Sequence, residues 1–327
     1  MKRYVETLTK IFKKARDKRQ AHRECSGVLG EISHDPDFLK SCIRNHLKKR
    51  GSLNQLHYPF PSFPAELNPY FGLVINCWIP IADDSAPTQR TTTAIHSHGE
   101  MILTTATIFG AGYENWTFSP AILMDPENEI FELKRVEQSM HSLHHVLFID
   151  SFMPHAPFFP PSLTITLALW SSSHPTHWKD HVKRFPFFKG NEKWLRAGLS
   201  KLGLQKAFDL KIINYFDFHP QGAGFKGLKT RQEYPRGTNA DYLSSLFYIL
   251  QQTGNEDITH DIQEHLRSSG AILNRDLIRQ LLLKIKKGEI IENQLSGCHF
   301  KPPHASFTKH EIEAALRRGI YAGSHAG

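Results

Sequence analysis

Residues 91–113 read TTTAIHSHGEMILTTATIFGAGY and place two histidines, His96 and His98, among runs rich in Thr and Ile. β-Branched residues favour strands, and side chains two positions apart on a strand point to the same face. The two imidazoles are therefore predicted to converge on one side of a strand, where they could hold a metal ion at about 2.1 Å. Two histidines on a solvent-facing strand are the alternative interpretation.

The surrounding region, residues 70–172, contains further short segments with strand character. Turn-like clusters such as ADDSAP and DPENE separate these segments, which are LVINCWIPI, ILTTATIF, NWTF, EIFELKRV, HHVLFID and SLTITLALW. Short strands at this spacing predict an antiparallel sandwich or barrel. Because SLTITLALW alternates strictly, its Leu and Ile face is predicted to pack against a second sheet, while its Thr and Ala face leaves room for a cavity.

Both ends of the chain are predicted to be helical. Apolar residues recur at helical spacing in two early segments, the first reaching about residue 23, and in several later ones. The last of these carries a capping box, Thr308 with Glu311 three residues on. HPQGAGFKGLKTRQEYPRGTN is interpreted as a loop between helices. The prediction is an α+β chain with a helical segment and Pro-rich linker (1–66), a β-barrel (67–172) and a helical C-terminal domain (173–327).

The chain has 327 residues and a formal net charge of +8, much of it from Lys and Arg near the N-terminus. These residues lie largely off the apolar stripe of a predicted helix and accompany no nucleic-acid-binding motif, which indicates a solvated helix face. There is no apolar run of roughly 20 residues, no secretory signal core and no CxxC pair. We expect a cytoplasmic protein without a membrane span or a nucleic-acid partner. The sequence leaves open whether the chain forms a homodimer.

The spacing around the histidine pair resembles the first motif of the cupin superfamily, whose members have a double-stranded β-helix barrel. That motif continues from His-x-His to a Glu after three or four residues and to a Gly after six more. Gly110 falls at the position of the glycine, whereas Leu103 falls where the glutamate is expected. Glu100 shares the strand face of the histidines and stays an alternative ligand.

Cupins take their last metal ligand from a second motif on a later strand. In HHVLFIDSFMPHAPFFPPSLTITLALW the histidine before the long apolar strand, His155, is the predicted third ligand. His144 and His145 are the alternatives. The glycines that precede this histidine in the family are absent here. The resemblance covers residues 70–172, roughly a third of the chain.

Three histidines without the glutamate resemble the thiol dioxygenase branch of the cupins. The resemblance implies a mononuclear Fe(II) centre with O₂ as co-substrate. Three neutral imidazoles leave the ion its full +2 charge, which attracts an anionic chelating substrate, so a small amino-acid-like or thiol-like metabolite is predicted. Tyr113 and Trp116 could line the pocket and donate a hydrogen bond, or lie in the barrel core or at its rim. Arg90 could pair with a substrate carboxylate or lie in an exposed loop, and Asp150 could orient a ligand histidine or cap a turn.

Two other functions are compatible with the same barrel. Imidazole ligands do not select iron strongly, so zinc, manganese or nickel could serve an isomerase or a hydrolase. A barrel that binds a ligand without catalysis is the second alternative, and the missing glutamate favours it. A separate histidine group, His177 and His181 in HPTHWKDH, is interpreted as a solvated helix start.

Overall fold

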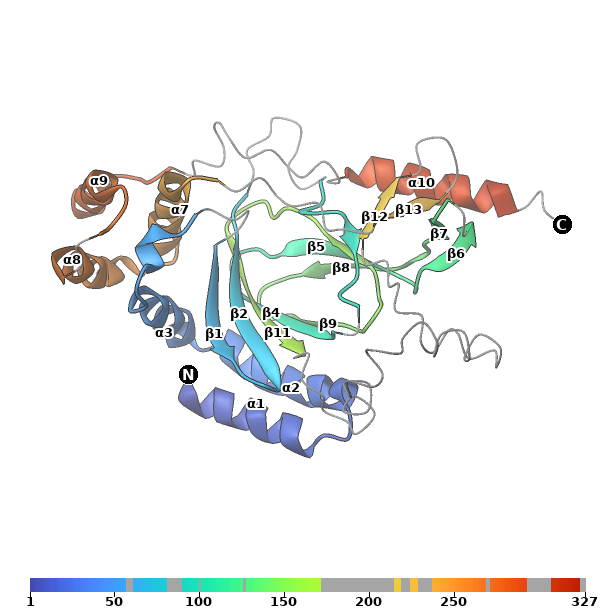
Figure 1. Cartoon of the computed structure of the whole chain (residues 1–327), viewed down its shortest axis with the longest axis horizontal. Helices are drawn as coiled ribbons and strands as arrows, with labels where there is room; N and C mark the ends of the chain where they lie inside the picture. The colour runs from blue at the N-terminus through green and yellow to red at the C-terminus, as the bar shows by residue number, and fades with distance from the viewer. Residues whose placement is uncertain are drawn as a thin grey trace, which may run out of the picture.

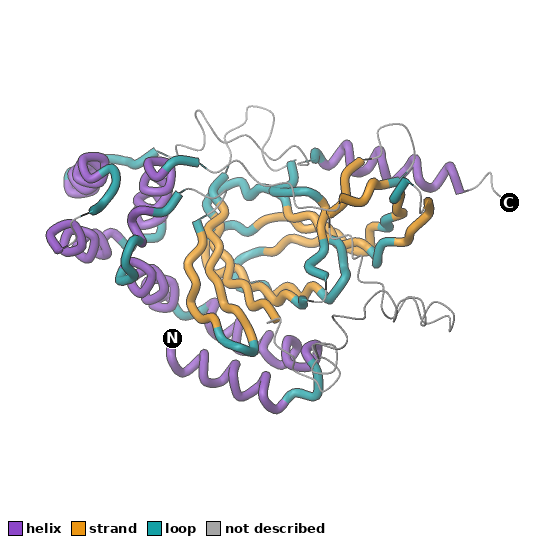
Figure 2. The backbone as a smooth tube through the Cα atoms, viewed as in Figure 1, coloured by secondary structure: helices purple, strands orange, loops and turns teal. Residues whose placement is uncertain are grey.

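The computed structural model describes residues 1–56, 61–80, 90–99, 101–125, 128–171, 215–218, 224–228, 237–268, 271–292 and 307–323. Two antiparallel sheets form a β-barrel, and helices lie against it (Figure 1, Figure 2). The first sheet has the spatial order β1 (Ser62–Leu67), β2 (Phe71–Trp78), β11 (Thr164–Ser171), β4 (Leu103–Phe109) and β9 (Val146–Ile149). The second has the order β6 (Ile122–Asp125), β7 (Ile130–Glu132), β13 (Phe225–Leu228), β12 (Tyr215–Phe218), β3 (Ile95–His96), β10 (His155–Pro157), β5 (Tyr113–Phe118) and β8 (Arg135–His141).

Eight of these strands form a jelly roll. In chain order they are β2, β3, β4, β5, β8, β9, β10 and β11. The first sheet holds the first, eighth, third and sixth of them, and the second sheet holds the second, seventh, fourth and fifth. This exchange of strands between two sheets is the double Greek key of the jelly roll, the architecture of the cupins. The predicted α+β class and double-stranded β-helix are therefore confirmed.

The two faces of β11 have different surroundings. Ile165, Leu167 and Leu169 belong to a core cluster that also contains the apolar residues of helices from both ends of the chain. This face therefore packs against helices, and the prediction that it packs against the second sheet is wrong. Ala168 and Trp170 belong to a separate cluster with inward residues of β4 and β9, so the Thr and Ala face lines the barrel interior. A strand's alternation shows that a face is buried, but it does not specify what covers it.

The N-terminal helices cover the outer face of the first sheet (Figure 1). They are α1 (Lys2–Lys14), α2 (Lys18–Ser33) and α3 (Pro36–Leu47), followed by the 3₁₀ helix η1 (Ser52–Asn54). The predicted single helix to residue 23 is two helices, because the chain turns at Ala15 and Asp17 then caps α2 by accepting a hydrogen bond from Gln20 N–H. Buried His22 connects α2 to the sheet, with one ring nitrogen 2.9 Å from Thr104 Oγ1 and the other 3.1 Å from Ser171 Oγ.

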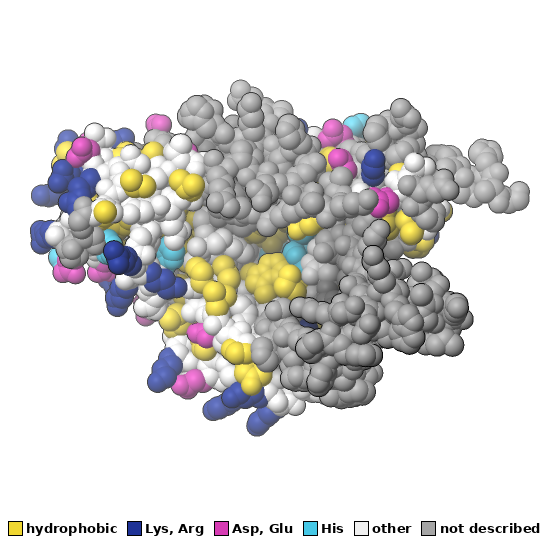
Figure 3. All heavy atoms as spheres, in the orientation of Figure 1, with side chains coloured by type: hydrophobic (Ala, Val, Ile, Leu, Met, Phe, Trp, Pro, Cys, Tyr) yellow, Lys and Arg dark blue, Asp and Glu magenta, His cyan; other side chains and the backbone are white. Residues whose placement is uncertain are grey.

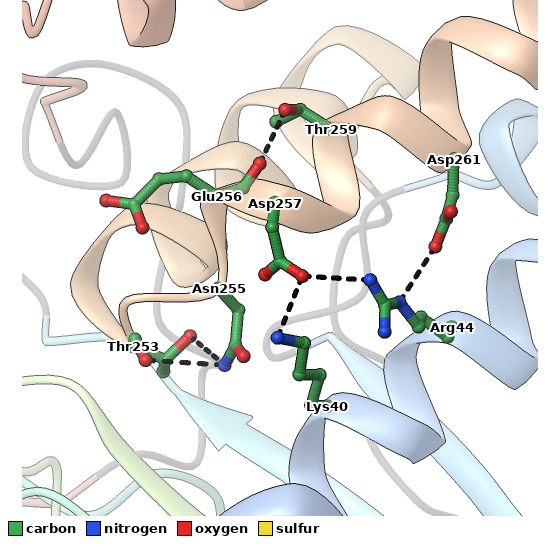
Figure 4. A network of polar contacts seen from close by, with 8 residues as sticks. All are labelled: Lys40, Arg44, Thr253, Asn255, Glu256, Asp257, Thr259 and Asp261. Atoms are coloured by element: carbon green, nitrogen blue, oxygen red, sulfur yellow. Dashed lines mark hydrogen bonds and ion pairs between the residues drawn. The ribbon is translucent and has the colours of Figure 1, made fainter.

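The C-terminal helices α7 (Asn239–Gln252), α8 (Thr259–Ser268) and α9 (Arg275–Lys286) follow, with the 3₁₀ helix η4 (Glu256–Ile258) before α8. Buried residues of α7 share the core cluster of α1–α3, so this cluster contains residues from all three predicted domain ranges. Ion pairs join α3 to the η4–α8 segment (Figure 4). Asp257 lies 2.8 Å from both Lys40 and Arg44, and Asp261 lies 3.0 Å from Arg44.

The outer face of the second sheet packs against α10 (Lys309–Gly323). Its predicted capping box is present, since Thr308 N–H donates to Glu311 Oε2 at 2.7 Å and Glu311 N–H donates to Thr308 Oγ1 at 3.2 Å. The prediction that FKGL belongs to a loop is wrong, because these residues form β13, which pairs with β12. β12 pairs in turn with β3 and so extends the sheet that carries His96.

Lys and Arg side chains gather over the helical end of the molecule and along α1 on the face drawn in Figure 3. In α1 the buried residues are Tyr4, Leu8 and Phe12, whereas Lys10, Lys13 and other basic residues are exposed. The basic N-terminal segment thus has the solvated helix face that was predicted. Among the described residues, no helix is both long enough and apolar enough to cross a membrane.

Candidate metal centre

Three histidines meet on the inner side of the second sheet. His96 ends β3, His98 follows two residues later, and His155 opens β10 directly opposite His96 in the strand register. One ring nitrogen from each lies within 4.8 Å of the other two. The ring centroids are 4.3 Å apart for His96 and His155, 4.7 Å for His98 and His155, and 4.9 Å for His96 and His98. The two predicted motifs are thus brought together by the pairing of β3 with β10.

Neighbouring groups orient two of the rings. His96 Nδ1 lies 2.9 Å from the carbonyl oxygen of Ala94, so Nδ1 carries the proton and Nε2 keeps a lone pair for a ligand. Such a hydrogen bond to a backbone carbonyl is common for metal-binding histidines. Tyr215 of β12 stacks on the His96 ring at 6.1 Å, and Trp170 packs edge-on against His98 at 4.4 Å. Each ring is thereby held by strands distant in sequence.

His155 is the most enclosed of the three, with 4% of its surface exposed. Burial, followed by the proximity of His96 and His98, lowers its pKa well below 6.5. The ring is therefore neutral at physiological pH and retains a lone pair. Its buried Nδ1 makes no hydrogen bond of good geometry within the described part of the chain, although the backbone of Met153 and His96 lies close to the ring. Buried nitrogens are normally satisfied, so a converging set of neutral imidazoles with such an atom fits a divalent metal ion.

The backbone at Gly110, the glycine of the first motif, requires a residue without a side chain. Gly110 adopts φ +88°, and a Cβ built there would lie 2.0 Å from the carbonyl oxygen of Leu163. Only glycine avoids both the left-handed strain and the contact. Leu103, at the position expected for glutamate, packs in the barrel interior with Leu147 and Ile149, so it provides an apolar wall and no ligand. Glu100 lies outside the described residues, as do His177 and His181.

Tyr113 and Arg90 lie near one another at one end of the second sheet. Tyr113 is four residues along β5 from Thr117, the residue that pairs with His155, a distance of about 14 Å along a strand. Its buried ring packs against those of Trp78 and His141. The Arg90 carbonyl accepts a hydrogen bond from Phe159 N–H, which places its backbone four residues along from His155 as well. Their assignment as substrate-binding residues stays a prediction.

The other candidates lie away from the three rings. His144 stacks on His34 at 3.9 Å, and His145 Nδ1 lies 3.4 Å from His141 Nδ1, so neither alternative ligand joins the cluster. Asp150 pairs with Arg19 at 2.8 Å and accepts a hydrogen bond from the backbone of Ser151.

The proposed pocket role of Trp116 is wrong. Its ring lies in the outer cluster of the second sheet, and its N–H donates to Glu114 at 2.6 Å.

Several residues around the centre carry no local signal in the sequence. Tyr215 reaches His96 only because β12 pairs with β3, and its segment follows a region interpreted as helical. Thr117 and Asn115 lie on the inward face of β5 beside the histidine row. The alternation of YENWTF could have identified this face, since its larger apolar members Trp116 and Phe118 lie on the other side.

No family model and no curated protein matches the chain. Solved structures that resemble it include an RmlC-like cupin from Shewanella frigidimarina NCIMB 400, with 8% identity, coverage of 36% of this chain and 82% of that one, and a TM-score of 0.22. A protein with a double-stranded β-helix domain from Klebsiella pneumoniae subsp. pneumoniae MGH 78578 has 12% identity, coverage of 34% and 76%, and a TM-score of 0.21. The DMSP lyase DddQ from Ruegeria pomeroyi DSS-3 has 12% identity, coverage of 35% and 47%, and a TM-score of 0.21. Known proteins similar to this chain thus include cupins and an enzyme.

Proposed function

We propose that the protein is a mononuclear non-haem Fe(II) oxygenase that acts on a small anionic metabolite of the amino-acid or thiol type. The observation that carries the proposal is the convergence of three imidazoles on the inner side of a cupin-like barrel. His96, His98 and His155 would hold the ion. Ferrous iron, when bound, would supply the redox chemistry that uses O₂.

The charge of the site supports the choice of an anionic substrate. The low pKa of His155 keeps this ring neutral, and His96 is oriented as a neutral ligand by the Ala94 carbonyl. Neutral ligands do not offset the charge of a divalent ion. A carboxylate or thiolate of the substrate would therefore neutralise part of the positive charge at the centre. Leu103 and Trp170 would limit water access beside the ion, because both lie in the apolar cluster inside the barrel.

Metal analysis of protein purified without oxygen and without a nickel affinity step tests the proposal. We expect nearly one iron per chain in the wild type and loss of iron in His96→Ala, His98→Ala and His155→Ala, because removing one of three ligands leaves too few to hold the ion. His260→Ala is the matched control, since this side chain is 70% exposed and pairs only with a surface glutamate among the described residues. Circular dichroism would establish that each variant is folded.

The alternatives give different results in the same experiment. Stoichiometric zinc or manganese, with no oxygen consumption, would replace the oxygenase by an isomerase or hydrolase. A folded protein that contains no metal and takes up no added Fe(II) would contradict the catalytic proposal and leave a ligand-binding barrel. Oxygen uptake by the iron protein during a screen of amino-acid and thiol metabolites would support the oxygenase.

A further inference from the structure

Two polar side chains on the inner face of the second sheet each have a buried atom without a hydrogen-bond partner among the described residues. Asn115 lies on β5 and is 1% exposed, and Ser139 faces it directly on β8. The side-chain Nδ2 of Asn115 and Oγ of Ser139 are both buried and form no hydrogen bond with any described residue. Buried amide and hydroxyl groups are satisfied in most native structures, so an adjacent pair of this kind indicates a site for a ligand or water.

The strand register shows that this pair faces the histidines' side of the sheet. His155 pairs with Thr117, and Pro157 pairs with Asn115, two residues further on. Residues opposite one another share a face, and residues two apart do so as well. The intervening residues confirm the orientation independently, because Ala156 and Trp116 both belong to the outer cluster that packs against α10.

The spacing and the chemistry of the pair define what it could bind. A step of two residues along a strand is about 7 Å, so the pair lies one row of side chains away from the histidine row. The Asn115 amide nitrogen is a donor only, and the Ser139 hydroxyl can donate or accept. Both are neutral, so they suit an acceptor oxygen and do not require a full charge.

We propose that Asn115 and Ser139 form a second subsite that positions the substrate by hydrogen-bonding an oxygen at its far end. The inference rests on the proposed metal centre, which would bind the near end. The substrate class is thereby narrowed to small two-ended molecules, with a carboxylate or thiolate for the metal and a carbonyl or carboxylate oxygen at the other end. Asn115 is a positioning residue in this arrangement, since it does not contact the metal.

Titration of the Co(II)-loaded protein with carboxylates tests the subsite. Acetate can reach only the metal, whereas succinate and glutarate carry a second carboxylate. The visible absorption of Co(II) reports binding of either kind. We expect the wild type to prefer one of the dicarboxylates over acetate, and we expect Asn115→Leu to reduce this preference by about tenfold, the effect of losing one hydrogen bond to a charged acceptor. Ser139→Ala should reduce it by a smaller factor, and acetate affinity should stay unchanged.

Gln138→Leu is the matched control, because Gln138 lies next to Ser139 but donates to Glu114 on the outer face. Its dicarboxylate preference should equal that of the wild type. An unchanged preference in both Asn115→Leu and Ser139→Ala, or a wild type that binds both dicarboxylates no better than acetate, would overturn the subsite while leaving the metal centre intact. Failure of the wild type to bind Co(II) would instead refute the metal centre, and the subsite with it.

Discussion

Acidification should weaken the attachment of α2 to the barrel through His22. This side chain is 0% exposed, and its two ring nitrogens face hydroxyls of Thr104 and Ser171. Burial lowers its pKa from 6.5 to about 3. Below pH 6.5 the unfolded chain therefore binds a proton at His22 that the folded chain does not bind. The stability contributed by neutral His22 is present above pH 6.5 and is lost progressively as the pH falls toward 3.

The size of the loss follows from the two pKa values. Each pH unit below 6.5 costs about 1.4 kcal/mol as long as the folded-state ring stays neutral. From pH 7.5 to pH 4.5 only the last two units count, so the free energy of unfolding should fall by about 3 kcal/mol on account of His22 alone. Other titrating groups add their own contributions, which must be subtracted.

Comparison with His22→Gln makes that subtraction. Glutamine can still hydrogen-bond to hydroxyl groups but does not titrate, and the variant retains the other ionisable residues of the chain. Urea unfolding of both proteins at pH 7.5 and pH 4.5 gives two pH-dependent losses. We expect the wild-type loss to exceed that of the variant by about 3 kcal/mol. Equal losses in the two proteins would refute the claim that His22 is buried in its neutral form.

Two further substitutions, one of them with a matched control, test the role of Gly110 and the cap of α10. Gly110→Ala should lower the free energy of unfolding by at least about 2 kcal/mol, because the new Cβ meets the Leu163 carbonyl at a positive φ. Gly27→Ala is the control, because Gly27 lies on the exposed face of α2 and no atom lies within 4 Å of the new Cβ. In this variant the free energy of unfolding should rise by roughly 0.5–1 kcal/mol. Urea midpoints distinguish the two, and equal effects would contradict the steric argument. Thr308→Ala removes the side chain that caps α10, so it should lower the free energy of unfolding by about 1 kcal/mol and speed amide hydrogen exchange in the first turn of α10. Unchanged exchange in that turn would argue against the cap.

Much of the fold could be predicted because its signals are local. The alternation of SLTITLALW and the Thr and Ile runs identified strands that the structure contains, and the second of the two early segments with helical spacing contains α3. The break at Ala15 and the β12–β13 hairpin were missed. The break at Ala15 has a local signal, the Asp17 cap of α2, which was overlooked. The hairpin depends on a contact distant in sequence, because β12 pairs with β3.

Some residues of the candidate site could likewise be predicted from local sequence, and others could not. The convergence of His96 and His98 was predicted from strand periodicity, although β3 ends at His96, and Gly110 was identified from its spacing. His155 was predicted as the third ligand only through the resemblance to the cupins, which take their last ligand from a second motif. Asn115 could not be singled out, since a polar residue on a predicted strand has no special significance until its face and its missing partners are known.

The sequence by itself determined the positions of several barrel strands and the helical character of both ends, and it predicted that His96 and His98 converge, although His98 lies two residues beyond the end of β3. Only the tertiary structure decided that β10 pairs with β3, that helices cover the apolar face of β11, and that Asn115 points inward near the histidines. The physical reason is that side-chain periodicity acts between neighbours in the chain. Strand pairing and burial, in contrast, depend on which distant surfaces meet, and several partners can satisfy the same pattern.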